Sequence, residues 1–163
     1  MVLIFLLFCG VSAAQERLNI KGVSIGQTIA ELPPELAAGC TGNKCSLSFL
    51  TRERSSSPLS TIVGGRIKFW TVELEGTPAS VIKITAAMDT KSMQSVNIVT
   101  LTEALAEKFK APTCSPSKCV IVSGTDTLRV LQMLTSDLFA ITIESERSEA
   151  RDKAIKTKAK ADL

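Results

Sequence analysis

Histidine and tyrosine are absent from this chain, and tryptophan occurs once, at position 70. The missing imidazole removes the commonest general base, so a Ser/His/Asp triad and a Cys/His pair are both excluded. A Ser/Lys dyad stays open because both residue types are plentiful, but no motif singles one out. Glu103 and Glu107, four residues apart, are better explained as a solvated helix face than as paired glycosidase carboxylates. We therefore expect no enzyme, no cofactor and no metal.

Charge is also absent from the start of the chain, since no charged residue precedes Glu16. Residues 2–8 form an apolar run typical of a secretory signal, and small residues follow it as at a cleavage site. The run is shorter than the roughly 20 residues that a membrane-spanning helix needs. We predict a signal peptide over residues 1–14 and a periplasmic or secreted mature protein.

Three alternatives remain for this segment. It forms a buried N-terminal strand, it is an uncleaved anchor, or Cys9 is a lipidation site. The bulky Phe8 argues against lipidation, because that position is small in lipoprotein signals. The lack of a basic residue ahead of the apolar run is also compatible with a start further upstream.

Two cysteine pairs share one spacing: Cys40 with Cys45 and Cys114 with Cys119, each separated by four residues. Removal of the predicted signal peptide also removes Cys9, the fifth cysteine of the chain, and leaves four in an oxidising compartment, which predicts two disulfides. Of the three connectivities, the local one is favoured because turn-forming residues lie between the members of each pair. Closing so short a loop stabilises by about 2 kcal/mol in the chain-entropy model. The alternative is a four-cysteine zinc site, which export disfavours.

Positive charge is concentrated at the end of the chain. Residues 151–163 hold five basic and two acidic residues, a net of +3, which equals the net charge of the whole chain. The rest is close to neutral, unlike the footprint of a nucleic-acid-binding domain. We expect no nucleic-acid partner, and membrane contact only through the basic tail.

Periodicity predicts a mixed fold. Short helical turns are expected near residues 25–32 and 35–40 and a long helix over 90–110, while 66–75, 79–86, 127–133 and 138–143 alternate as strands. We predict an α+β class with helices packed on one face of an antiparallel sheet. Residues 15–145 form one domain, and 146–163 form a charged helical or disordered tail.

An internal repeat is suggested by the 74-residue offset between the two cysteine pairs (114 − 40). At this offset Lys44 and Cys45 align with Lys118 and Cys119. We predict two tandem helix–Cys loop–strand units, over 18–88 and 89–145. The alternative is chance agreement between two similar cysteine turns.

Trp70 is the best candidate for a contact residue. Regular alternation along the predicted strand places it on one face with Arg66 and Lys68, and tryptophan is enriched at binding hot spots. In the alternative, Trp70 packs beneath the long helix with Val72 and Leu74.

Three segments carry a family resemblance: Ile20-Lys-Gly-Val-Ser-Ile-Gly26, Gly64-Gly-Arg66, and Leu101-Thr-Glu-Ala-Leu-Ala-Glu-Lys-Phe109 closed by Lys-Ala-Pro112. Together they resemble small exported bacterial domains of uncharacterised function that are similar to the β-lactamase-inhibitory-protein and SmpA/OmlA outer-membrane assembly lipoprotein folds. The resemblance implies helices on an antiparallel sheet, disulfides near the helix-to-strand joins, and action by binding proteins. The binding face of the inhibitory protein is rich in aromatic residues, whereas this chain has seven in total, so no inhibitor contact residue is transferred.

These observations predict an exported, non-catalytic protein-binding module that is cross-linked by two local disulfides, with an inhibitor-like role as one form of that binding. Its partner is expected to be an envelope or secreted protein. The alternatives are a structural or assembly accessory of the outer membrane and an envelope enzyme.

Overall fold

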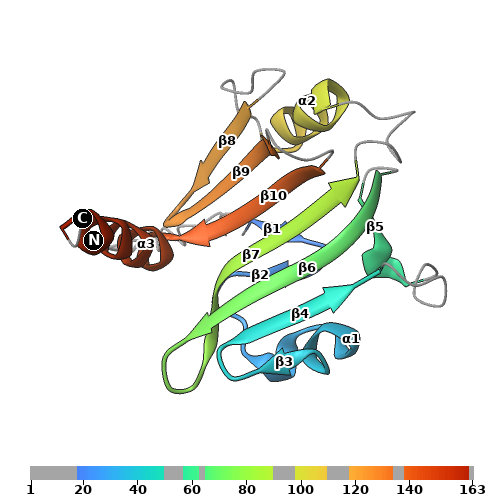
Figure 1. Cartoon of the computed structure of the whole chain (residues 1–163). Coiled ribbons are helices and arrows are strands. Elements are labelled where there is room, and N and C mark those ends of the chain that lie inside the picture. Colours follow the sequence, from blue (N-terminus) through green and yellow to red (C-terminus); the bar gives the residue numbers. More distant parts are fainter. Residues whose placement is uncertain are drawn as a thin grey trace, which may run out of the picture.

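The computed structural model describes residues 18–49, 57–62, 65–89, 98–109, 118–133 and 138–161 (Figure 1). Within these ranges the helices are η1 (Ile29–Glu31), α1 (Pro34–Ala37), η3 (Pro58–Ser60), α2 (Ile98–Lys108) and α3 (Glu146–Ala161). The strands are β1 (Asn19–Ile20), β2 (Val23–Ser24), β3 (Cys40–Thr41), β4 (Lys44–Ser48), β5 (Thr61–Ile62), β6 (Gly65–Glu75), β7 (Ser80–Asp89), β8 (Lys118–Ser123), β9 (Asp126–Met133) and β10 (Leu138–Ser145).

One antiparallel sheet dominates the structure. Its strand order is β3-β4-β6-β7-β10-β9-β8, and β5 adds a short pairing to β6. The long strands pair in hairpins, β6 with β7 and β9 with β10. The two hairpins then meet at the β7–β10 pair, where Thr85 faces Thr142. The β6–β7 hairpin and the later β9–β10 hairpin therefore belong to one hydrogen-bonded sheet.

One face of the sheet forms the core, because alternate residues of every long strand are apolar and point to the same side. Figure 1 shows the β1–β2 hairpin behind the sheet. Residues of this hairpin, of α1 and of α2 belong to the core cluster, as does Leu18 just before β1; Leu18, Leu36 and Leu101 are each 0% exposed, and Ile29 of η1 packs against the cluster. The core face of the sheet includes Leu47, Trp70, Ile84, Ile143, Leu128 and Ile121.

The prediction of an α+β fold with helices packed on one face in two tandem helix–Cys loop–strand units is wrong. The structure is mainly an antiparallel sheet, and the expected helical turns near residues 25–32 and 35–40 reduce to the three residues of η1 and the four of α1. The adjacent prolines Pro33 and Pro34 account for this, since proline interrupts helix propagation. The prediction of two tandem units is also wrong, because β7 and β10 join the two hairpins into one sheet with one core.

Residues 146–161, predicted as a helix or a disordered tail, form the 16-residue helix α3. It leaves the end of β10 and projects away from the sheet (Figure 1). Its first half is held against the sheet, while residues 153–161 are exposed. The first half of α3 meets the face opposite the core, as the ion pairs below show.

Candidate functional site

The first cysteine pair forms the predicted disulfide. Cys40 and Cys45 face each other across β3 and β4, with Cα atoms 3.8 Å apart. Cys45 is fully buried, so the bridge ties the short strand β3 to the core side of β4. Cys119 is buried in β8, and Cys114 lies outside the described residues. The second disulfide stays a prediction, as do the signal peptide over residues 1–14 and the cleavage site, which also lie outside them.

Trp70 lies in the core. Its side chain is 0% exposed, and its Nε1 donates a hydrogen bond to the carbonyl oxygen of Leu59 at 3.0 Å. Regular alternation does not hold along β6, because the β6–β7 register shifts between Ile67 and Phe69. This irregularity changes which residues face the core. Trp70 consequently shares the core face with buried Ile67.

The shift also separates the three predicted binding residues. Arg66 is exposed and Lys68 is half-buried, whereas Trp70 is enclosed. Phe69 takes the opposite side from Trp70 and is 36% exposed. Phe69 was not among the predicted binding residues, because in a strand without the irregularity Phe69 and Ile67 would lie on the same side.

The face opposite the core carries a row of hydroxyl side chains. We call the surface formed by this row and Phe69 the open face. Ser46 of β4, Thr71 of β6, Thr85 of β7 and Thr142 of β10 are paired in register on four neighbouring strands. Ser46 is exposed and the three threonines are half-buried. Among the described elements, α3 is the one that forms ion pairs with this side of the sheet.

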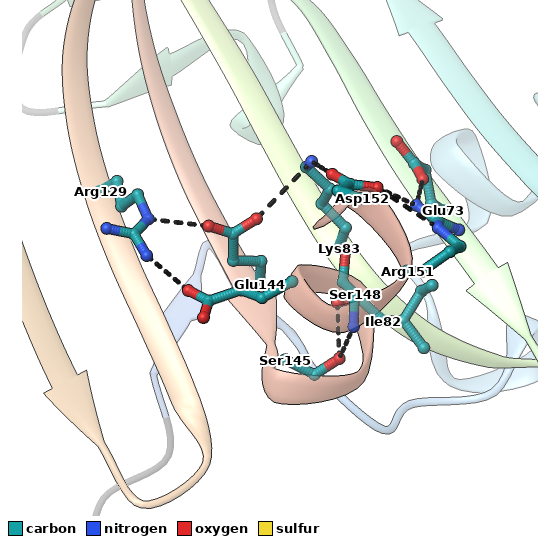
Figure 2. Close-up of polar contacts among 10 residues, drawn as sticks. Glu73, Ile82, Lys83, Arg129, Glu144, Ser145, Ser148, Arg151 and Asp152 are labelled. Carbon is teal, nitrogen blue, oxygen red and sulfur yellow. Dashed lines mark hydrogen bonds and ion pairs between the residues drawn. The ribbon is translucent and has the colours of Figure 1, made fainter. Parts of the chain in front are cut away.

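A chain of alternating charges, the charge ladder, joins α3 to that face (Figure 2). Lys83 Nζ lies 2.6 Å from Asp152 Oδ2 and 3.6 Å from Glu144 Oε2. Arg129 Nε lies 2.8 Å from Glu144 Oε1. The ladder comprises Glu149, Arg129, Glu144, Lys83, Asp152, Arg151 and Glu73, in that order of contact.

Hydrogen bonds fix the base of α3 in addition to the ladder. The Ser148 backbone N–H donates to Ser145 Oγ at 3.2 Å, which satisfies a free donor of the first turn. The Ser145 hydroxyl donates in turn to the carbonyl oxygen of Ile82 at 3.1 Å, on β7. The start of α3 is thus tied to the sheet through buried polar groups.

The ladder shifts the pKa of its members in the directions that favour pairing. The hydrogen bond from Lys83 lowers the pKa of Asp152, and nearby Arg151 adds to this, against the opposing effect of burial. Burial pulls the pKa of Lys83 down, but the hydrogen bond and charge of Asp152, with Glu144 and Glu73, outweigh it and raise that pKa. Both groups are charged at neutral pH.

We expect the docking of α3 to weaken in strong acid and in strong base. The pKa of Asp152 lies below its ordinary value of 3.8, so its contribution is complete above that pH and is lost as the pH falls through the lowered pKa. The contribution of Lys83 is complete below pH 10.5 and is lost as the pH rises through its raised pKa. Amide NMR shifts of α3, recorded against pH, measure both limits.

The control for this pH dependence is Lys83→Met, which removes the main partner of Asp152. Its acid limit should move to higher pH, toward the ordinary value of a free aspartate. Identical acid limits in the two proteins would show that the Lys83–Asp152 pair does not hold α3.

No family model, curated protein or solved structure matches the chain. In the described ranges no helix has both the length and the apolar character to cross a membrane. The described side chains also include no group of three or more His, Cys, Asp or Glu placed to hold a metal ion. The family resemblance drawn from the sequence stays a prediction.

Proposed function

We propose that this chain is an exported, non-catalytic protein-binding module that takes its partner on the open face. One observation carries the proposal: the core face of the sheet is packed, whereas the other side presents Phe69, 36% exposed, beside the row of hydroxyls. The signal-like start and the Cys40–Cys45 bridge support export.

The open face has the chemistry of an interface. Phe69 is paired with Ala87, and Ala87 is paired with Ala140, so small residues flank the ring on neighbouring strands. Ala87 is itself only 1% exposed, so the accessible part of this region is the Phe69 ring and its exposed neighbour Ser48 on β4, and an exposed aromatic ring of this kind can anchor a partner. Strands lie about 4.8 Å apart, so the row from β4 to β10 spans roughly 14 Å. Four hydroxyls over that distance give the polar contacts that fix orientation.

Photo-crosslinking in cells tests the proposal. Phe69→p-benzoylphenylalanine retains an aromatic ring at the exposed position and should give a covalent adduct of one discrete mass. The matched control carries the same group at Ala30, an exposed residue of η1 on the core-covering side. Adding Thr142→Arg to the Phe69 variant should reduce the adduct by about tenfold, because a long charged side chain obstructs the face.

Two results would contradict a binding role for the open face. One is the absence of a discrete adduct from the Phe69 position. The other is equal yield from Phe69 and Ala30, which would indicate collisional labelling. Circular dichroism of each variant checks that the sheet is retained.

A further inference from the structure

Charge is separated along α3. Its acidic residues Glu146, Glu149 and Asp152 lie in the first half, and Glu149 and Asp152 are paired with Arg129 and Lys83 of the sheet. Residues 153–161 contain four lysines and no acidic residue, and all of them are exposed. The second half of α3 is therefore an exposed, positively charged helix, and the acidic residues Glu149 and Asp152 of its first half are already paired with the sheet.

A pocket of about 440 Å³ lies in the angle between α3 and the sheet. We call it the lysine notch; its lining comprises Lys83, Arg129, Glu144, Glu149, Asp152, Lys153 and Lys156. Its three carboxylates are each engaged by Lys83 or Arg129. Lys153 and Lys156 have no ion-pair partner among the residues that the structure describes. Three positions apart on a helix, they lie on one side of it.

We propose that the lysine notch binds an acidic segment of the same protein partner, through its carboxylates on Lys153 and Lys156; this inference rests on the proposed function. The notch continues the open face, because Arg129 is paired in register with Thr142, the last hydroxyl of the row. A segment that crosses the row along this line reaches Arg129, which is 33% exposed, and then the two lysines.

The surroundings favour peptide carboxylates over a lipid surface or a phosphate. At 100° per residue, Ile155 lies about 160° from Lys153 and about 100° from Lys156, so it does not share the side of the helix that carries the two lysines and does not accompany them into a bilayer. The three carboxylates of the lining oppose a doubly charged phosphate more strongly than single carboxylates. Separate carboxylates along a peptide reach each lysine with one charge at a time.

The test uses a fluorescent octaglutamate peptide as the probe and the full chain, with binding followed by anisotropy at low salt. Lys153→Gln/Lys156→Gln should weaken binding by about tenfold, the sum of two exposed ion pairs. The matched control is Lys158→Gln/Lys160→Gln, which removes the same charge from the same helix at positions outside the notch lining. The control should lose less than about threefold.

Equal loss in the two variants would show diffuse attraction to net charge and overturn the inference. Failure of octaglutamate to bind, or tighter binding of polyphosphate or phosphatidylglycerol vesicles through the same lysines, would overturn it too. The Phe69 crosslink separates the two proposals. Its yield should fall in the Lys153→Gln/Lys156→Gln chain; an undiminished adduct overturns the notch alone, and no adduct in the parent chain overturns the open face.

Discussion

Replacing Trp70 with alanine is expected to lower the free energy of unfolding by about 3–5 kcal/mol. The largest side chain of the core is removed from a fully enclosed site, and the Leu59 carbonyl loses its donor. The two effects add, because a cavity remains and a buried acceptor is left unsatisfied. Urea denaturation should be followed by far-UV circular dichroism, since this substitution removes the sole tryptophan of the chain.

The neighbouring residue provides the control for this prediction. Phe69→Ala removes a ring that is 36% exposed on the open face, and we expect a loss below about 1 kcal/mol. Trp70→Phe should fall between the two, because the ring volume is largely kept while the hydrogen bond is lost. Equal destabilisation by Trp70→Ala and Phe69→Ala would contradict the register shift that separates their two sides.

That register shift also shows how far the sequence could predict the fold. The long strands were predictable because apolar residues alternate over most of 66–75 and in 79–86, 127–133 and 138–143. The irregularity between Ile67 and Phe69 was not, since it is a property of pairing with β7 rather than of β6 alone. The junction of β7 with β10 is likewise non-local, and periodicity contains no information about strand order.

The docking of α3 is a second feature that could not be predicted from the sequence. The tail was predicted to be a charged helix or disordered, and the contacts that hold its first half on the sheet are ionic. Arg151 pairs with Glu73, 78 positions away, and no local pattern predicts such a partner. A signal was nevertheless present: Lys83, Arg129 and Glu144 are charged residues in the interior of strands, each with apolar residues on both sides or on one side of it in the sequence. Charges at such positions require partners, and the charged tail could supply them.

Gly39→Ala is expected to have the second large effect, a loss of about 3 kcal/mol in unfolding free energy. A Cβ atom at position 39 would overlap the backbone carbonyl oxygen of Ser46 and lie 3.2 Å from its carbon. The obstacle is main chain, so no side-chain rotation relieves it. The hydrogen bond from the Ser46 N–H to the Gly39 oxygen, 3.1 Å long, would be broken as residue 39 and strand β4 move apart. Chemical denaturation of oxidised protein measures the loss.

Gly42→Ala is the matched control, since an added Cβ there has nothing within 4 Å. Its backbone φ of +59° disfavours alanine, so a loss of about 1 kcal/mol is expected. If Gly39→Ala destabilises no more than Gly42→Ala, the close approach of residue 39 to β4 is not retained in solution.

The disulfide decides how the overlap at Gly39 can be relieved. Cys40 follows Gly39 directly and is bonded to Cys45, the neighbour of Ser46, so β3 cannot move away from β4 while the bridge is intact. In a Cys40→Ala/Cys45→Ala background β3 is free to separate, and the Gly39→Ala loss should fall by at least about 1 kcal/mol. Because Ser46 begins the hydroxyl row, the oxidised Gly39→Ala protein should also give less Phe69 adduct. If the effects of Gly39→Ala and of Cys40→Ala/Cys45→Ala on the unfolding free energy simply add, the Cys40–Cys45 disulfide does not hold this edge of the open face.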